Sequence, residues 1–273
     1  MRQGRHGAAF CRIMIMTIIT LTTDFGLADG YVGTMKGVIL GLCPAARLVD
    51  LSHEIAAQNV AQAAFVLSRA AAYFPAGAIH LAVVDPGVGS DRRPLLVQTP
   101  AALFVGPDNG LFTFALDEPG SQAWELNRPE YWLPHVSRTF HGRDIFAPVA
   151  GHLARGVLPE QLGRPISDPV RLSLPRPVRH ADGRITGQVV HADRFGNLIT
   201  NAPADWVAAG RWRVEIDGRE INGLSATYAD AAPAALLALV SSGVTVEIAV
   251  REGSAADRLG VGVGELVVLR QVG

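Results

Sequence analysis

MIMTIITLTTDFG, residues 14–26, decides how the first half of this chain folds. The run 14–22 is apolar and rich in β-branched residues, and it leads directly towards Asp24. A continuous apolar run of this length predicts a strand that is buried on both faces, as in a parallel sheet. Ligands of open parallel sheets bind beyond the carboxyl ends of the strands, so Asp24 lies where a site is expected.

The Asp-Phe-Gly sequence at Asp24 also occurs in protein kinases, where its acid binds magnesium. In kinases the glycine-rich loop, a strand lysine and a His-Arg-Asp loop all precede it. Here only 23 residues precede Asp24, while the similar fragment FHGRDIF (140–146) and the one lysine, Lys36, both follow it. The chain also lacks a Gly-x-x-x-x-Gly-Lys-Ser/Thr loop, so the sequence argues against a kinase and against a P-loop enzyme.

The composition is that of a globular chain with one large domain or two modest ones. Of 273 residues, 49% are hydrophobic and 18% are charged. The formal net charge of −1 gives no argument for binding nucleic acid or an anionic membrane surface. No apolar run is long enough to predict a membrane-spanning helix.

The N-terminus has the outline of a signal peptide, with positive charge before the apolar run, but no small-residue cleavage site follows. We expect residues 1–13 to be a loose extension, with Met14 or Met16 as the true start. Cys11 and Cys43 fit neither a metal-binding spacing nor a disulfide framework. They are expected to be buried thiols, which favours a cytoplasmic location.

Residues 14–170 are predicted to form an α/β domain with a largely parallel sheet, because strand-like and helix-like runs alternate. A linker is expected at 171–183, inside a segment with three prolines and little periodicity. Residues 184–273 change to short runs of period two and predict an all-β barrel domain. In the first domain the expected helices are 30–43, 59–74 and 144–156, and the expected strands after residue 22 are 46–52, 78–85 and a pair within 95–110.

Three acids stand at the ends of expected strands in the first domain, namely Asp24, Asp50 and Asp85. Each could instead be a helix cap or a turn former. Asp85 is the strongest candidate, because a glycine turn follows it and Arg92 lies seven residues further on. These two residues could line a charged pocket, or they could form an ordinary surface ion pair.

Two further stretches carry polar groups that could bind a ligand. His141 precedes a helical run, where it could equally be a helix N-terminal partner with Asp144 as the cap. A metal site would use His141, Asp85 and Asp24, but no tight ligand spacing such as His-Glu-x-x-His supports it. HADRFGNLITN (191–201) interrupts a strand pattern and is either a hairpin turn or a ligand-facing turn.

Eight motifs stand in a fixed order along the chain: TDFGLADGYVGTMKG, DLSHEI, VVDPGVG, RRP, GPDNG, FHGRDIFAP, DRFGNLITN and SSGVTVEIAVREGSAA. Together they resemble the S-adenosylmethionine hydroxide adenosyltransferase family, whose relatives are fluorinating and chlorinating enzymes acting on the same substrate. The resemblance extends from about residue 17 to about residue 270. It implies an α/β domain followed by a β-barrel, and a homotrimer whose active sites lie between neighbouring subunits.

The resemblance implies that S-adenosylmethionine and water give adenosine and L-methionine, with no cofactor and no metal. The substrate is a sulfonium, so methionine leaves as a neutral thioether and an oxygen nucleophile in line with the 5′ carbon is what the site must supply. The family's catalytic set corresponds to Asp85, Arg92 and His141. Asp85 would orient or deprotonate water, Arg92 would hold water or hydroxide, and His141 would shuttle a proton.

The resemblance also assigns substrate contacts. Asp24 would bind the two ribose hydroxyls, since one carboxylate can accept two hydrogen bonds. Where this chain has Ser242 the halogenating relatives have an arginine, and the spacing around Asp193 differs from theirs by one residue. The remaining implied contacts are Asp29 and Asp193 near the methionine amino group, Asn197 on adenine with Phe195 as an apolar wall, and Ser241 and Ser242 at the methionine carboxylate.

Two other functions stay open at this point. A halogenase on the same scaffold is the first, although Arg92 and His141 favour water as the nucleophile and no insertion is evident between Gly89 and Gly106. A non-catalytic protein that binds S-adenosylmethionine or adenosine is the second. A metal-dependent hydrolase is a more distant alternative.

Overall fold

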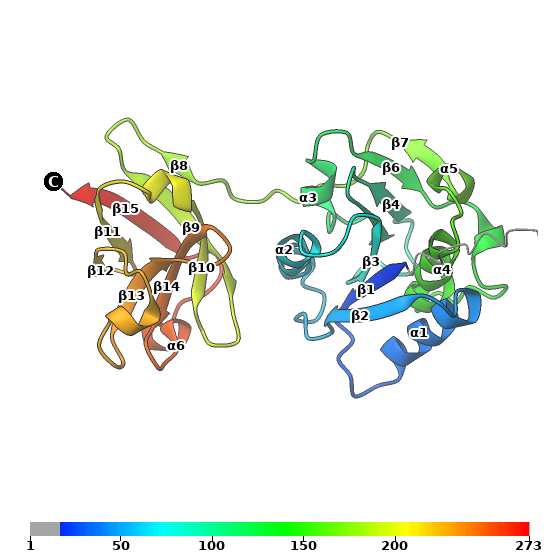
Figure 1. The fold of residues 1–273 in the computed structure, drawn as a ribbon, viewed down its shortest axis with the longest axis horizontal. Coiled ribbons are helices and arrows are strands. Elements are labelled where there is room, and N and C mark those ends of the chain that lie inside the picture. The colour runs from blue at the N-terminus through cyan, green and yellow to red at the C-terminus, as the bar shows by residue number, and fades with distance from the viewer. Residues whose placement is uncertain (1–16, 273) are drawn as a thin grey trace, which may run out of the picture. The chain divides into compact units, whose positions relative to one another are not determined.

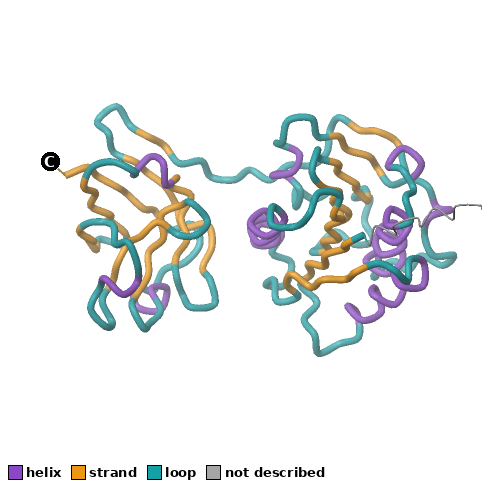
Figure 2. The backbone as a smooth tube through the Cα atoms, in the orientation of Figure 1, coloured by secondary structure: helices purple, strands orange, loops and turns teal. Residues whose placement is uncertain are grey.

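A computed structural model describes residues 17–272, and the chain divides into two compact units between Leu172 and Ser173 (Figure 1). The start of the strand expected at 14–22 and the extension 1–13, with Cys11, lie outside the described residues. The first unit combines helices and strands, and the regular structure of the second is mostly strand, joined by loops and short helical turns (Figure 2). Both units have the fold class that the sequence predicts.

A seven-stranded sheet runs through the first unit. In spatial order its strands are β2 (Arg47–Ser52), β1 (Ile18–Thr23), β3 (Ala78–Val83), β5 (Ala102–Pro107), β4 (Pro94–Gln98), β6 (Gln122–Glu125) and β7 (Arg164–Ile166). The pairs β2–β1, β1–β3 and β3–β5 are parallel. The remaining three strands extend the sheet through antiparallel pairs.

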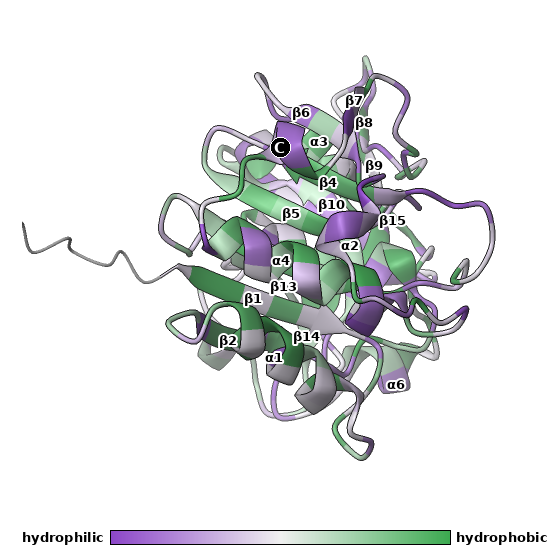
Figure 3. Cartoon of the chain, turned by 90° about the vertical axis from the view of Figure 1, so that its right-hand side faces the viewer, coloured by the Kyte–Doolittle hydropathy of each residue, from purple (hydrophilic) through white to green (hydrophobic). Residues whose placement is uncertain are grey.

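Helices cover both faces of this sheet, so its strands are hydrophobic along most of their length (Figure 3). The helices are α1 (Tyr31–Leu42), α2 (Val60–Ala71), α3 (Thr113–Leu116), α4 (Ala147–Ala154) and α5 (Pro159–Leu162). α1 and α4 pack on one face around Met35 and Ile39. α2 and α3 pack on the other face around Leu67 and Ala115.

β3 lies at the centre of the sheet, and all its residues are buried. Leu81 and Val83 face the core under α1 and α4, whereas Ala82 faces the core under α2. His80 is the one ionisable residue of the strand, and its Nδ1 lies 2.8 Å from Thr20 Oγ1. Burial lowers the pKa of His80 to about 4, so it is a neutral core residue at physiological pH.

The strand order places two candidate acids at the same edge. From β1 the chain continues to β2 on one side, and it then crosses to β3 on the other side of β1. The order in which strands are added to the sheet therefore reverses between β1 and β3. Such a switch point is where open α/β sheets bind ligands. Thr23 is in register with Val83, and Asp24 and Asp85 follow these residues in the chain.

An eight-stranded antiparallel sheet forms the second unit and curls into a nearly closed barrel. Its strands are β12 (Arg219–Asn222), β11 (Arg211–Ile216), β15 (Leu266–Val272), β9 (Ile185–Ala192), β10 (Leu198–Pro203), β14 (Thr245–Val250) and β13 (Leu236–Val240), with β8 (Val178–Arg179) beside β9. A bridge between Ser225 and Leu239 connects the segment after β12 with β13. The unit also has the helix α6 (Ala255–Leu259). The sequence did not predict β8, β12 or β13.

Within residues 17–272, no helix has both the length and the apolar character that crossing a membrane requires. The longest helices, α1 and α2, have 12 residues each, and both pack against the sheet.

Leu81→Ala should lower the free energy of unfolding of the first unit by about 2–5 kcal/mol, because truncation leaves a cavity at the centre of the sheet. Leu81 is 0% exposed. Hydrogen exchange of the β1 and β3 amides in denaturant would measure the loss. Leu158→Ala is the control, since Leu158 is 54% exposed and its truncation should change stability by less than about 0.5 kcal/mol. Equal losses in the two variants would contradict the packing described here.

Candidate active site

Asp85 begins a tight loop that follows β3 and returns the chain to β4. Within this loop the Ser90 amide donates to the Gly87 carbonyl over 3.1 Å, and the Ser90 hydroxyl donates to the same oxygen over 2.6 Å. Gly89 has φ +79°, and a Cβ there would lie 2.4 Å from the Arg138 carbonyl oxygen. Glycine is therefore needed where this loop meets the segment that leads to His141.

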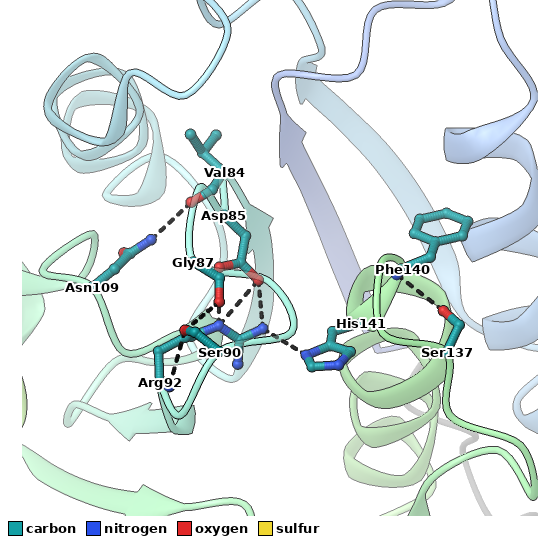
Figure 4. A network of polar contacts seen from close by, with 9 residues as sticks. All are labelled: Val84, Asp85, Gly87, Ser90, Arg92, Asn109, Ser137, Phe140 and His141. Atoms are coloured by element: carbon teal, nitrogen blue, oxygen red, sulfur yellow. Dashed lines mark hydrogen bonds and ion pairs between the residues drawn. The ribbon is translucent and has the colours of Figure 1, made fainter.

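Arg92 lies between Asp85 and His141 (Figure 4). Its Nε donates to both oxygens of Asp85, at 2.9 and 3.1 Å, and its Nη2 also donates to Oδ2. Nη2 lies 2.9 Å from Nδ1 of His141. The side chains of Arg92 and Asp85 are only 9% and 5% exposed, so this is a buried ion pair with an imidazole attached to it.

The hydrogen bond to Arg92 decides the state of His141. A guanidinium has no acceptor, so Nδ1 of His141 must accept and the proton of the neutral ring is on Nε2. Burial lowers the pKa of His141, and the positive charge of Arg92 lowers it further, while Asp85 and Asp144 oppose the shift. His141 is therefore neutral at physiological pH.

One donor of Arg92 remains unused. Nη1 is buried and has no hydrogen-bond partner among the residues that the structure describes. The guanidinium carbon lies 5.1 Å from the centre of the Phe146 ring, which covers one face of the group. Because a buried donor without a partner is costly, Nη1 is the atom of this cluster that most needs a ligand.

His141 stands directly before a π-helical turn, Gly142–Phe146, which continues into α4. The sequence predicted an ordinary helix from residue 144. Asp144 in this turn is fully buried, and it accepts hydrogen bonds from the Ser137 amide at 2.8 Å and from Nε of Arg143 at 2.5 Å. It thus holds the segment 137–141 in place.

Asp24 lies in the loop after β1, where its Oδ2 accepts a hydrogen bond of 2.8 Å from the Gln58 amide. The next residue, Phe25, packs edge to face on Phe140 with 5.9 Å between the ring centres. The Asp24 loop therefore contacts the segment that carries His141. Asp29 lies further along this loop and is exposed.

Two other acids of the first unit, Asp50 and Asp108, have partners within the fold. Asp50 binds Lys36 Nζ at 2.6 Å, with His53 Nε2 3.0 Å away. Asp108 is buried and binds Nε of Arg93 at 2.9 Å. The neighbouring Asn109 donates from Nδ2 to the Val84 carbonyl over 2.9 Å, directly before Asp85 (Figure 4).

The second unit has a pocket of about 590 Å³ beside the turn that follows β9. A cavity of this volume is large enough for a small ligand such as a nucleoside. Three residues singled out from the sequence line it, namely Asp193, Phe195 and Asn197. The other lining residues are Tyr228, Val250, Arg251, Glu252 and Gly253.

The turn at Asp193 is held by its own side chains. Oδ1 of Asp193 accepts from the amides of Phe195 and Asn197, both at 2.9 Å, and Oδ2 accepts from Nδ2 of Asn197 at 3.0 Å. Nδ2 of Asn197 is thereby oriented, and Oδ1 of Asn197 is left to accept a hydrogen bond from a ligand. Phe195 is 75% exposed at the edge of the pocket.

A hydrogen-bonded pair beside this pocket was missed from the sequence. Tyr228 donates its hydroxyl to Oε1 of the buried Glu247 over 2.6 Å. Burial and Glu247 together raise the pKa of Tyr228 to about 12. The signal was an acid inside the apolar run TVEIAV, where Glu247 is the only polar residue after Thr245.

Ser241 and Ser242 lie apart from this pocket. They belong to the turn between β13 and β14, in which the Ser241 amide donates to the Thr245 carbonyl over 2.9 Å. The pocket is lined from the other end of β14, at Val250. The structure therefore groups Asp193, Phe195 and Asn197 but places the two serines at the opposite end of the strand.

Among residues 17–272, no three His, Cys, Asp or Glu side chains are arranged to hold a metal ion. The metal site considered from the sequence would use Asp85 and His141. The guanidinium of Arg92 lies between this carboxylate and this imidazole, where a metal ion would have to bind. The positive charge of this cluster is thus supplied by the chain itself.

Two family models match this chain, one for each unit. The model of the SAM hydroxide adenosyltransferase N-terminal domain matches residues 19–163, and that of the C-terminal domain matches residues 187–268. The chain belongs to the SAM hydroxide adenosyltransferase family. Asp24, Asp85, Arg92 and His141 lie within the first of the two matched ranges.

Curated relatives of this family member include both hydrolases and fluorinases. It is 42% identical to the (R)-S-adenosyl-L-methionine hydrolase of Salinispora tropica, over 90% of this chain and 95% of the relative. It is 40% identical to the Thermus thermophilus protein of the same name, over 90% of this chain and 96% of the relative. Similarity to the fluorinase of Nocardia brasiliensis is lower, at 28% identity over 78% of this chain and 83% of the relative.

Solved structures of similar proteins share the fold. An uncharacterized conserved protein from Thermotoga maritima has a TM-score of 0.87 and 35% identity, over 93% of this chain and all of that chain. A conserved hypothetical protein from Thermus thermophilus has a TM-score of 0.77 and 38% identity, with the same coverage.

Arg92→Gln should raise the pKa of His141, because the substitution removes a cation in contact with the ring while the carboxylate of Asp85 remains. NMR titration of the imidazole C–H signals would measure the change. Arg164→Gln is a matched control, since it removes an arginine that is paired with Glu125 at the other edge of the sheet and should leave the His141 titration unchanged. An unchanged or lowered pKa in Arg92→Gln would contradict the assigned contact.

Proposed function

We propose that this protein hydrolyses S-adenosyl-L-methionine to adenosine and L-methionine. Water attacks the 5′ carbon, the bond from that carbon to sulfur breaks, and its electron pair leaves with methionine as a neutral thioether. One proton of the water is released. The observation that carries the proposal is the buried, unpartnered Nη1 of Arg92 beside Asp85 and His141, since this donor suits a water or hydroxide oxygen.

Arg92 holds the nucleophile in this proposal, and Asp85 takes the proton. His141 Nδ1 already accepts from Arg92, whereas Asp85 accepts only the bonds from Arg92 and keeps an unused lone pair on Oδ1. Attack by neutral water produces an oxonium, which is a strong acid, so a carboxylate is basic enough to receive its proton. His141 fixes the guanidinium through Nδ1, and the proton on Asp85 passes to solvent when the products leave.

The substrate contacts form part of the same proposal. Asp24 binds the ribose hydroxyls with the lone pairs that Gln58 leaves unused. Adenine occupies the pocket of the second unit, with Oδ1 of Asn197 accepting from its amino group and Phe195 against its ring. The methionine end is held by Asp29 and Asp193 at its amino group, whereas Ser241 and Ser242 are left out of the proposal because they lie at the opposite end of β14 from this pocket. No cofactor takes part, and the cytoplasm is the proposed location.

Incubation of the purified protein with S-adenosylmethionine in EDTA should give adenosine and methionine in equal amounts by chromatography, with no dependence on added chloride or fluoride. Arg92→Ala should lower kcat by about 10²–10³-fold while the Kd for the substrate changes little, as for loss of a donor that acts in the transition state. Arg164→Ala serves as the exposed-arginine control.

The outcomes separate the alternatives. A halogenated nucleoside would assign the protein to the halogenating branch of the family. Tight binding without any product would make it a binder of S-adenosylmethionine, and loss of activity in EDTA would indicate a metal-dependent hydrolase.

We also propose that the protein is a homotrimer in which the first unit of one subunit and the second unit of the next share each substrate. The exposure of Phe195 supports this, because a large aromatic side chain at the edge of a pocket is usually covered when the site is complete. The catalytic cluster and the pocket also belong to different units.

Co-expression of Arg92→Ala and Asn197→Ala should restore activity that neither variant has alone. With random assembly and shared sites, about a quarter of the sites combine an intact first unit with an intact second unit. Specific activity should therefore reach about a quarter of the wild-type value. The control is co-expression of wild type with the double variant. No activity above the sum of the separate variants would contradict shared sites.

A further inference from the structure

His53 is a buried histidine that the proposed chemistry does not use. It stands in the motif DLSHEI, directly after β2, and its side chain is 2% exposed. Its Nδ1 lies 2.8 Å from Oγ1 of Thr23, the last residue of β1. Its Nε2 lies 3.0 Å from Oδ1 of Asp50. Nδ1 is thus bound at the edge of the sheet where Asp24 leaves β1, while the buried Nε2 is within ion-pair distance of Asp50 but makes no well-aligned hydrogen bond with it.

The polar contacts around His53 form one series, in which the donor and the acceptor of each contact can be assigned. Lys36 Nζ donates to Oδ2 of Asp50 over 2.6 Å, so Asp50 is ionised; partial burial raises its pKa, but the contacts with Lys36 and His53 hold that pKa below the ordinary value. A carboxylate only accepts, so the proton of His53 is on Nε2 and Nδ1 accepts from the Thr23 hydroxyl. Oγ1 of Thr23 in turn accepts from the Phe25 amide over 3.3 Å.

The same segment also holds the Asp24 loop through its backbone. The carbonyl of His53 accepts from the Gly26 amide over 2.8 Å. The amide of Gln58 donates to Oδ2 of Asp24 over 2.8 Å. Gln58 has φ 65°, a left-handed conformation that costs a non-glycine residue of order 1 kcal/mol. That cost is consistent with a backbone N–H that must point at Asp24.

Asp24 is therefore flanked on both sides by residues that His53 contacts. Thr23 precedes it and is bound by the ring, while Gly26 follows it and is bound by the carbonyl. Among residues 17–272, Gln58 is the only hydrogen-bond donor to the Asp24 carboxylate, so its orientation depends on this segment. A carboxylate that accepts from two adjacent hydroxyls at once needs a fixed orientation.

We propose that His53, supported by Asp50 and Lys36, is a positioning residue that sets the orientation of the Asp24 carboxylate for a ribose diol. This inference rests on the proposed function of Asp24 and adds a residue to it. His53 does not touch the substrate in this account. Loss of His53 weakens the binding of the substrate and of the transition state by the same amount, so it changes KM and Kd far more than kcat.

The test is a double-mutant cycle of Asp24→Ala and His53→Phe, read by the Kd for S-adenosylmethionine in calorimetry. His53→Phe alone should raise Kd by about 5–20-fold, the equivalent of one or two lost hydrogen bonds, with kcat within about twofold. In the double variant Kd should equal that of Asp24→Ala alone, because His53 acts only through Asp24. Additive losses would overturn the inference.

Two further variants protect the test against misfolding and nonspecific effects. Lys36→Met removes the ammonium group that binds Asp50. Because the Lys36 side chain is 30% exposed, the substitution should raise Kd by about 2–5-fold without unfolding the protein. His53→Gln, which can still reach Asp50, should recover part of the affinity that His53→Phe loses. An unchanged Kd in both His53→Phe and Lys36→Met would overturn the inference.

His180→Phe is the matched control. His180 makes a histidine–threonine contact of the same length, 2.8 Å from Nε2 to Oγ1 of Thr186, but in the second unit. Its replacement should leave Kd unchanged, and an effect as large as that of His53→Phe would overturn the inference. Failure of the wild type to bind or cleave S-adenosylmethionine would instead overturn the proposed function, and the positioning role with it.

Discussion

The buried pair of Arg92 and Asp85 is the interaction on which the candidate site depends. Two charged side chains at 9% and 5% exposure are stable in a folded core only when each satisfies the other. The pair sets the tautomer of His141 and orients the remaining donor Nη1. Removing either charge would leave the other buried and unpaired, which is far more costly than losing a surface ion pair.

The fold brings this pair to the carboxyl ends of β1 and β3 through a short series of constraints. Full burial of β3 on both faces requires an apolar run, and the first position beyond it that tolerates charge is the loop that begins at Asp85. The parallel register of β1 and β3 then brings Asp24 to the same edge. The π-helical turn before α4 completes the arrangement, because His141 just before the turn and Phe146 at its end both contact Arg92.

Much of this could be predicted from the sequence, and the reason is periodicity. Continuous apolar runs marked β1 to β5 of the first unit but not the short strands β6 and β7, and the acids at the ends of three runs marked the expected ligand edge. β12 and β13 were missed, since REIN is short and LLALV has no alternation. The contact of His53 with Thr23 and the bond between Tyr228 and Glu247 join residues 30 and 19 positions apart, and no local pattern reports such contacts. The π-helical turn also has no sequence signal that distinguishes it from an ordinary helix start.

The π-helical turn Gly142–Phe146 constrains the surroundings of Arg92 through its backbone as well as through its side chains. His141 and Phe146 both face the guanidinium, yet they are five residues apart. In an ordinary α-helix residues at this separation point about 140° away from each other, whereas a turn closed from i to i+5 brings them to one side. If Gly142–Phe146 kept its length but wound as an ordinary α-helix, the imidazole would turn away from Arg92 even with every side chain of the cluster retained. An intact set of site residues is therefore not enough to place the imidazole, because the backbone of the turn between His141 and Phe146 orients it as well.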